Sequence, residues 1–334
     1  MEYKFEFRPY QRQFRVPVKT SHGTWDLRKG IILRLTDEKG KEGFGEIAPV
    51  SWLGSETFEQ ALDFCQQLPK VITPTNIFSV PDELPACQFG IESAWETITT
   101  HALTLSGMPL EDLPDPTSEP EMCSGLLPPG QAAILACKIL WKKGYRTFKW
   151  KIGVIPIQLE LRILEQLVQS ILEDFSADDS ISLRLDANGG LTDVEASQWL
   201  HVCDRAGKII EFLEQPLPVD QFDQMKKLSD RFSTPIALDE SVVTLKQMKE
   251  VYQKGWNGIF VIKPSIAGSP SQIRQFCKSK NIDAVFSSVF ETEIGREAAL
   301  RLASELNTKH NRPVGFGVNH WFDDNFDVHQ LWHD

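Results

Sequence analysis

Short apolar runs alternate with helix-like segments after residue 121, and this alternation strongly limits what the chain can fold into. The eight runs are residues 122–127, 148–152, 182–187, 211–216, 236–241, 258–264, 284–290 and 314–318. Strands and helices that alternate at this pace are typical of a parallel sheet built from βαβ units. Eight such units in about 200 residues favour a (β/α)8 barrel of the α/β class, and a doubly wound open sheet is the alternative.

The residues before this repeat predict a smaller α+β domain. The elements expected there are a hairpin of residues 31–36 and 42–47 and helices at 55–68 and 87–105. Prolines at positions 109, 114, 116 and 120 then indicate a linker. The chain is therefore expected to consist of an α+β domain at 1–105, a linker at 106–121 and a barrel at 122–312.

Composition argues against several classes of function. The 334 residues carry 35 basic and 46 acidic side chains, a net charge of −11, without the basic patch that nucleic-acid-binding proteins use. This charge also disfavours anionic membranes, and the longest uncharged stretch is too short to be a transmembrane helix. The six cysteines show no metal-binding spacing, so we expect free thiols in a cytoplasmic protein. No nucleic-acid or membrane partner is predicted, and the oligomeric state is left open.

Three of the predicted strands end in a carboxylate. These residues are Asp186, Glu214 and Asp239, which lie 28 and 25 residues apart, about one βα unit each. Because the C-terminal ends of neighbouring barrel strands share one rim, this spacing brings the three carboxylates together. Three acids at one point require a cation, and a site made only of oxygen ligands fits Mg²⁺ better than Zn²⁺, with Mn²⁺ as the alternative.

Lysines flank these acids on both sides. Lys149 and Lys151 are two residues apart in one strand, so both side chains lie on the same face. Lys263 ends a later strand, beyond the last carboxylate. Two neighbouring ammonium groups beside a divalent cation disfavour each other's charge, so one of them can act as a neutral base near pH 7. The arrangement indicates abstraction of a proton α to the carboxylate of a small-molecule substrate.

The strings around these residues together resemble the enolase superfamily over nearly the whole chain. They are Lys149-x-Lys151, Asp186-Ala187-Asn188, Glu214-Gln215-Pro216, Asp239-Glu240-Ser241 and Ile262-Lys263-Pro264. Within the superfamily, the strings at 183–188, 261–269 and 286–291 are similar to the o-succinylbenzoate synthase family of menaquinone and phylloquinone biosynthesis. The resemblance implies an enolase-like fold, in which residues 1–105 cap the barrel and a C-terminal tail at 313–334 returns to the cap.

The resemblance also implies a reaction and the roles of the residues. Asp186, Glu214 and Asp239 would hold magnesium, and 2-succinyl-6-hydroxy-2,4-cyclohexadiene-1-carboxylate would lose water on one face to give 2-succinylbenzoate through a metal-stabilised enediolate. Lys151 would remove the α-proton and return it to the departing hydroxide. Lys149 would restrain the charge of Lys151 and touch the carboxylate, and Lys263 would stabilise the enediolate.

Seven further residues are candidate substrate contacts: Arg184, Ser265, Gly268, Ser287, Ser288, Trp25 and Leu53. Arg184 shares the face of Asp186, so it meets either a substrate carboxylate or one of the protein's own acids. Ser287 and Ser288 end a strand and are expected to donate to the succinyl carboxylate. Trp25 and Leu53 belong to loops of the first domain that suit a lid over the substrate.

Three alternative functions are kept. An N-acylamino-acid racemase, or another isomerase with two facing lysines, would use Lys151 and Lys263 on opposite faces of one carbon. From other classes, an aldolase would form a Schiff base on Lys263, but this leaves the three acids unexplained. A non-catalytic binding protein is the third alternative, and the complete set of lysines and acids argues against it.

Overall fold

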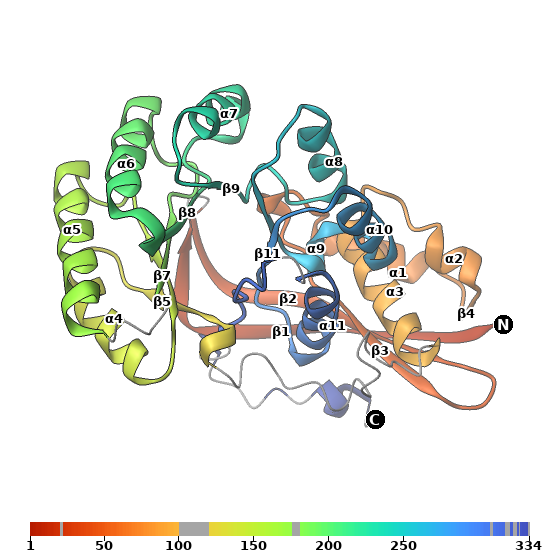
Figure 1. Cartoon of the computed structure of the whole chain (residues 1–334). Coiled ribbons are helices and arrows are strands. Elements are labelled where there is room, and N and C mark those ends of the chain that lie inside the picture. Colours follow the sequence, from red (N-terminus) through yellow and green to blue (C-terminus); the bar gives the residue numbers. More distant parts are fainter. Residues whose placement is uncertain are drawn as a thin grey trace.

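The computed structural model describes residues 1–20, 23–99, 120–175, 181–307, 310–317, 321–322, 326 and 328–332. These residues form an antiparallel sheet with helices packed on it and a curled parallel sheet with helices around its outside (Figure 1). The predicted linker at 106–121 lies outside the described residues except for positions 120 and 121. No helix among the described residues is long and apolar enough to cross a membrane.

The N-terminal part is the α+β unit that the sequence predicts. Its strands are β1 (Tyr3–Thr20), β2 (Gly23–Thr36), β3 (Glu42–Ile47) and β4 (Val71–Ile72), and its helices are α1 (Phe58–Gln67), α2 (Pro74–Phe78) and α3 (Pro85–Thr99). The strands are ordered β3-β2-β1-β4. The predicted hairpin is confirmed, because β2 and β3 pair from Ile31–Ile47 to Thr36–Glu42.

Glycines allow α3 to lie directly on the hairpin. A Cβ atom at Gly45 would lie 2.0 Å from the backbone oxygen of Gly90 in α3, and one at Gly43 would lie 2.3 Å from that of Ala94. Only hydrogen atoms fit at this separation of helix and strand, so a larger side chain at Gly45 would push α3 away. The close packing buries the apolar face of the sheet beneath α3.

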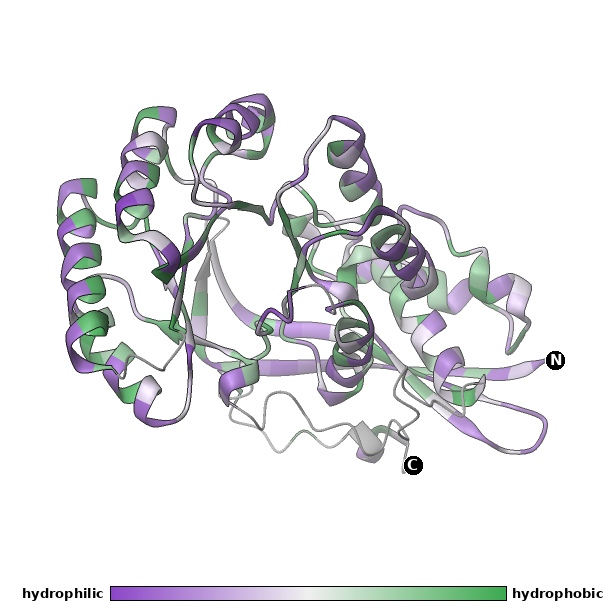
Figure 2. Cartoon of the chain, in the orientation of Figure 1, coloured by the Kyte–Doolittle hydropathy of each residue, from purple (hydrophilic) through white to green (hydrophobic). Residues whose placement is uncertain are grey.

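The second part is the barrel. Its strands, ordered β11-β10-β9-β8-β7-β6-β5 and all parallel, are β5 (Ser124–Leu127), β6 (Thr147–Lys151), β7 (Ser182–Asp186), β8 (Ile210–Glu214), β9 (Ile236–Leu238), β10 (Ile259–Ile262) and β11 (Ala284–Phe286). The helices between and after them are α4 (Ala132–Lys142), α5 (Ile157–Asp174), α6 (Asp193–Ala206), α7 (Phe222–Arg231), α8 (Leu245–Gln253), α9 (Pro264–Ala267), α10 (Pro270–Lys280) and α11 (Glu293–Leu306). Most of these helices are amphipathic, with hydrophilic residues on the outward side (Figure 2).

Residues 314 and 315 close the ring of strands. The backbone N–H of Val314 donates to Met122 and that of Ser124 donates to Val314, both at 2.9 Å. On the other side, the N–H of Gly315 donates to Phe286 at 2.8 Å. The eighth predicted strand, 314–318, is therefore reduced to two bridging residues among those described, and it lies just past the expected end of the barrel at residue 312.

Two carboxylates of the N-terminal unit hold it to the barrel. Glu46, at the end of β3, accepts the backbone N–H groups of Thr292 and Gly295, which begin α11. Glu92 of α3 accepts the N–H of Ser271 in the first turn of α10 at 2.6 Å. Anionic groups are favoured at helix N-termini, where backbone donors lack partners within the helix. These contacts fix the N-terminal unit over the side of the barrel formed by β10 and β11.

Candidate active site

The predicted acids lie together at the C-terminal rim of the barrel. Asp186 and Glu214 end β7 and β8 and are register partners, and Lys151 at the end of β6 is the register partner of Asp186. Asp239 directly follows β9, which pairs with β8. All three carboxylates are buried, whereas Lys151 is exposed. The parallel register of the sheet therefore produces the common rim that the spacing predicts.

Lysines hold these carboxylates. The Nζ atom of Lys149 lies 2.8 Å from Oδ2 of Asp186 and 2.8 Å from Oε1 of Glu214. The ammonium of Lys263 donates to Oδ1 of Asp239. Among the described residues, no three acidic, histidine or cysteine side chains surround one point in the arrangement of a metal site. The predicted ligands are thus assembled on one rim, in contact with lysine ammonium groups.

The charges at this rim shift one another's pKa values. Burial would lower the pKa of Lys149, but the carboxylates of Asp186 and Glu214 outweigh it and raise that pKa well above the usual lysine range. Lys263 shows the opposite balance, because burial, reinforced by the charge of Lys149, lowers its pKa to about 8. Burial and the neighbouring Asp186 raise the pKa of Glu214. Lys149 and Lys263 therefore differ, and Lys149 is the one held firmly in its charged form.

Residues that follow the acids fix their orientation, and none of these residues was assigned a role from the sequence. The buried Gln215 side chain accepts the N–H of Asp239 at 3.1 Å and donates to the Ser241 hydroxyl at 2.8 Å. Its φ of 36° is in the left-handed region, so the strand end bends sharply there. Asn188, also left-handed, donates its backbone N–H to Asp186 at 3.0 Å and its side chain to Glu240. The signal was available, because all four residues belong to the strings that carry the family resemblance.

An aromatic cluster joins the N-terminal unit to the barrel where three of the predicted substrate contacts lie. The Trp25 ring lies 5.6 Å from that of Phe290, which follows β11, and 5.7 Å from that of Trp52. Leu53 ends the adjacent short helix Ser51–Leu53 and packs against the core of the N-terminal unit. Ser288 accepts the backbone N–H of Phe290 at 3.0 Å. The structure therefore brings Trp25 and Ser288 to one aromatic junction, with Leu53 beside Trp52.

The other predicted substrate contacts are distributed more widely. The Ser265 hydroxyl is buried in α9 and has no hydrogen-bond partner among the described residues. Gly268, at the end of α9, faces the N-terminal unit, because a Cβ atom there would lie 3.0 Å from Oε1 of Gln88. The Ser287 hydroxyl donates to Gly315 at 3.4 Å, across the closure of the barrel.

Arg184 takes the second of the two roles left open for it. Its guanidinium pairs with Glu211 at 2.6 Å and donates to the carbonyl of Pro313 at 2.7 Å. Glu211 lies near the beginning of β8 and also pairs with Arg312, which pairs with Asp283 before β11. These partners lie at the N-terminal end of the strands, opposite the rim that carries the acids. Arg184 is therefore held by one of the protein's own acids, as part of an ionic network.

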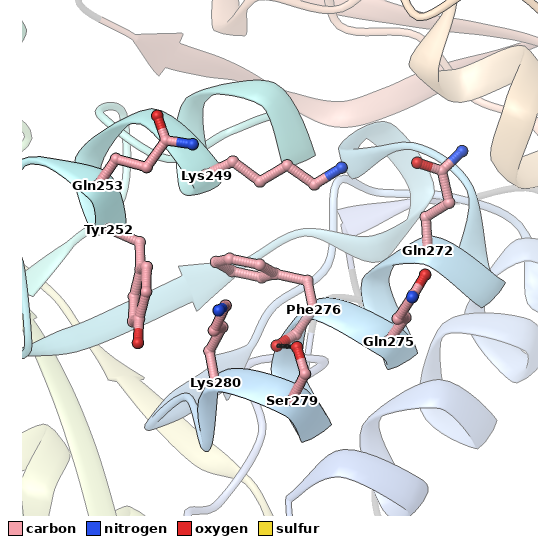
Figure 3. A pocket seen from close by; sticks show the side chains of 8 residues that line it. All are labelled: Lys249, Tyr252, Gln253, Gln272, Gln275, Phe276, Ser279 and Lys280. Atoms are coloured by element: carbon pink, nitrogen blue, oxygen red, sulfur yellow. Dashed lines mark hydrogen bonds between the residues drawn. The ribbon is translucent and has the colours of Figure 1, made fainter.

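A pocket of about 520 Å³ lies elsewhere, on the outer wall between α8 and α10 (Figure 3). It is lined by Lys249, Tyr252, Gln253, Gln272, Gln275, Phe276, Ser279 and Lys280. None of these residues belongs to the rim of acids and lysines. The pocket is a groove between two surface helices, separate from the candidate chemistry.

Comparison with known proteins gives the family. The family model "Enolase C-terminal domain-like" matches residues 132–333, and the model "MenC, N-terminal domain" matches residues 9–98. The o-succinylbenzoate synthase of Thermosynechococcus vestitus is 37% identical over 323 residues, which cover 95% of this chain and 93% of that protein. The chain belongs to the o-succinylbenzoate synthase family of the enolase superfamily. The family resemblance and the enolase-like fold predicted from the sequence are confirmed.

Solved structures agree with membership of the o-succinylbenzoate synthase family. The structure of the o-succinylbenzoate synthase from Thermosynechococcus elongatus, complexed with magnesium in the active site, matches with a TM-score of 0.85 at 35% identity and covers 99% of both chains. A more distant relative is the L-Ala-D/L-Glu epimerase of Bacillus subtilis, 26% identical over 86% of this chain and 81% of that protein. The solved structure of that epimerase, with a TM-score of 0.67 at 21% identity, has the same fold.

The residues at the rim could hold a magnesium ion, which the Thermosynechococcus elongatus structure contains in its active site. Three carboxylates on adjacent strand ends supply the oxygen ligands that Mg²⁺ prefers. The position between Asp186 and Glu214 already favours a cation, because the Lys149 ammonium is attracted to both carboxylates there. Asp186, Glu214 and Asp239 are therefore the residues that could hold such an ion.

Proposed function

We propose that the chain is an o-succinylbenzoate synthase, a lyase that dehydrates 2-succinyl-6-hydroxy-2,4-cyclohexadiene-1-carboxylate to 2-succinylbenzoate. The observation that carries the proposal is the 37% identity over 95% of the chain to an o-succinylbenzoate synthase. The rim of the barrel supports it, because Lys151, Asp186, Glu214, Asp239 and Lys263 follow one another on neighbouring strands. This is the set of groups that proton abstraction next to a carboxylate requires.

The lysines divide the work by their surroundings. Lys151 is exposed at the end of β6, where a substrate can reach it, so it is the base that takes the α-proton. The C–O bond to the hydroxyl group then breaks, and the Lys151 ammonium returns the proton to the departing hydroxide, which leaves as water. The ring becomes aromatic, which makes the elimination favourable. One base on one face is sufficient for both proton transfers.

The remaining charged groups stabilise the negative charge that forms on the substrate. When bound, magnesium supplies a Lewis acid at the substrate carboxylate. Lys263, whose pKa of about 8 leaves it mainly protonated at pH 7, places an ammonium beside the enediolate. Lys149, in the same strand as Lys151, is held in its charged form by Asp186 and Glu214 and keeps these two carboxylates oriented at the rim.

The direct test is incubation of the purified protein with the cyclohexadiene substrate and Mg²⁺. We expect formation of 2-succinylbenzoate, and loss of turnover when a chelator removes the metal. Racemisation of N-acylamino acids without dehydration would instead favour the isomerase alternative. Trapping of the protein by borohydride with a carbonyl substrate, without any need for Mg²⁺, would favour the aldolase. We further propose a cytoplasmic location, which the six buried cysteines support because none of them forms a disulfide.

A further inference from the structure

Arg28 of β2 is a fully buried guanidinium, only 1% exposed, and its hydrogen-bond partners among the described residues are all backbone carbonyls. It donates to Lys29 at 2.7 Å, to Pro49 at 2.9 Å, to Ala48 at 2.6 Å and to Phe290 at 3.3 Å. A buried arginine normally pairs with a carboxylate, because an uncompensated charge is costly away from water. The buried Arg184 follows that rule with Glu211, and the half-buried Arg274 also pairs with Glu96 and Glu305. Arg28 differs, because it has no carboxylate partner in the part of the chain that the structure describes.

The carbonyls that Arg28 binds belong to segments far apart in the sequence. Ala48 and Pro49 lead into the short helix Ser51–Leu53 of the N-terminal unit. Phe290 follows β11 of the barrel. Arg28 therefore joins the two segments that carry Leu53 and Ser288, two of the candidate substrate contacts. The Trp25 ring, a third candidate, lies 5.5 Å from the guanidinium.

The segment after β11 is strained where Arg28 holds it. Phe290 has a φ of 63°, a left-handed conformation that is unfavourable for an aromatic residue. Three contacts stabilise it: its carbonyl accepts from Arg28, its N–H donates to Ser288, and its ring packs on Trp25 and Phe14. Strained backbone that several contacts maintain is common where a protein shapes a ligand site.

The positive charge of Arg28 is complementary to the second carboxylate of the proposed substrate, which the rim does not bind. The proposed substrate carries two carboxylates. The metal and the lysines of the rim bind one of them. Arg184, the other arginine considered for the second carboxylate, is committed to Glu211 at the opposite end of the barrel. A buried cation that no described carboxylate contacts favours an anion nearby, because electrostatic interactions are strong in a low-dielectric surrounding.

We propose that Arg28 is a positioning and specificity-determining residue, which locks segment 48–53 of the N-terminal unit to segment 288–290 of the barrel and makes this wall electropositive toward the succinyl carboxylate. The inference rests on the proposed function. Arg28 acts through the wall that it shapes and through its field, and it takes no part in the proton transfers. It contributes to the choice of a dicarboxylate over a monocarboxylate of the same shape.

The test compares two ligands of the magnesium-loaded protein: 2-succinylbenzoate and 2-butyrylbenzoate, which lacks the second carboxylate. Arg28→Gln removes the charge and retains hydrogen-bond donors, and Arg28→Lys retains the charge. By calorimetry we expect Arg28→Gln to bind 2-succinylbenzoate at least about tenfold more weakly, with less than about threefold change for 2-butyrylbenzoate. Arg28→Lys should keep most of the wild-type preference. Arg34→Met, on the same strand but paired with Glu6 and Glu42, is the control and should bind both ligands normally.

Equal weakening of both ligands in Arg28→Gln would mean a merely structural role and would overturn the inference, as would no weakening at all. Loss of the preference in a folded Arg28→Lys variant would also overturn it, because the charge is retained there. The outcome is separate from that of the proposed function. A wild-type protein that fails to dehydrate the cyclohexadiene but prefers 2-succinylbenzoate through Arg28 would refute the function and leave the inference standing.

Discussion

The Nζ atom of Lys149 lies 2.8 Å from Oε1 of Glu214, two strands away in the barrel sheet. This contact joins the two groups of residues that the sequence presents separately, the paired lysines of β6 and the acids at the ends of β7, β8 and β9. It also distinguishes the lysines from each other. The positive charge of Lys149 is balanced by two carboxylates. Lys151, two residues later, is exposed at the same rim.

This difference predicts how arginine substitutions act on turnover. Guanidinium stays protonated, so Lys151→Arg cannot accept the α-proton and should be inactive, with no exchange of the α-proton for solvent deuterium. Lys263→Arg keeps the positive charge and should retain measurable dehydration. Both rates are measured with substrate and Mg²⁺ in D₂O, and Lys246→Arg on the outer helix α8 is the control. Robust turnover by Lys151→Arg would contradict the assignment of the base.

The magnesium site predicts opposite effects for two glutamates of the same strand. Glu214→Gln removes a charged ligand at the C-terminal end of β8, so the affinity for Mg²⁺ should fall by at least about tenfold. Glu211→Gln, at the N-terminal end, weakens the pairs with Arg184 and Arg312 and should lower stability without changing the affinity for Mg²⁺. Isothermal titration with Mg²⁺ and urea unfolding separate the two effects. Unchanged Mg²⁺ binding in Glu214→Gln would refute its role as a ligand.

The contact between the two units predicts a large loss of stability for Glu46→Ala. Glu46 is completely buried and accepts hydrogen bonds from Tyr10, Thr292 and Gly295. Its removal leaves several buried donors without a partner, so we expect a loss of about 3 kcal/mol in the free energy of unfolding. Urea denaturation measures it. Glu42→Ala, on the same strand but in a partly exposed pair with Arg34, should cost less than about 1 kcal/mol. Equal losses for the two variants would argue that the hydrogen bonds of Glu46 to the barrel do not contribute to stability.

Glu291 predicts a pH dependence of stability. Burial, with the nearby charge of Glu46, raises the pKa of its carboxyl from 4.5 to about 7, although Val289 and Ser288 hydrogen-bond to the charged form. The folded state therefore holds this proton more tightly than the unfolded state, so stability declines as the pH rises from about 4.5 to 7 and then levels off. Glu291→Gln stays neutral, so wild type should lose about 3 kcal/mol relative to the variant over this range. Urea unfolding at several pH values checks this, and a constant difference would contradict the prediction.

The sequence was sufficient for the barrel and for the candidate chemistry. Each strand could be recognised locally, and Asp186, Glu214, Asp239 and Lys263 could be placed because they end or directly follow strands of one parallel sheet. The C-terminal ends of such strands meet at one rim whatever the details of packing. Lys149 and Lys151 could be assigned to one face for a similar reason, because side chains alternate along a strand.

Only the tertiary structure decided which partner each of these groups meets. The sequence left Arg184 between a substrate and an acid, and the outcome depended on Glu211 and Pro313 at the opposite end of the barrel. Likewise, only the structure showed that the described residues of the expected eighth strand form just two bridges, Val314 to Cys123 and Gly315 to Ser287.

The sequence by itself therefore determined the order of strands, the rim and the groups placed on it, since these follow from periodicity within a few residues. Tertiary structure alone decided that Thr292 donates its backbone N–H to Glu46, 246 residues away in the sequence. It also decided which four carbonyls accept hydrogen bonds from Arg28. The physical reason is that a buried polar group takes whichever partners folding brings within about 3 Å of it. No local pattern records a partner that lies in another unit of the fold.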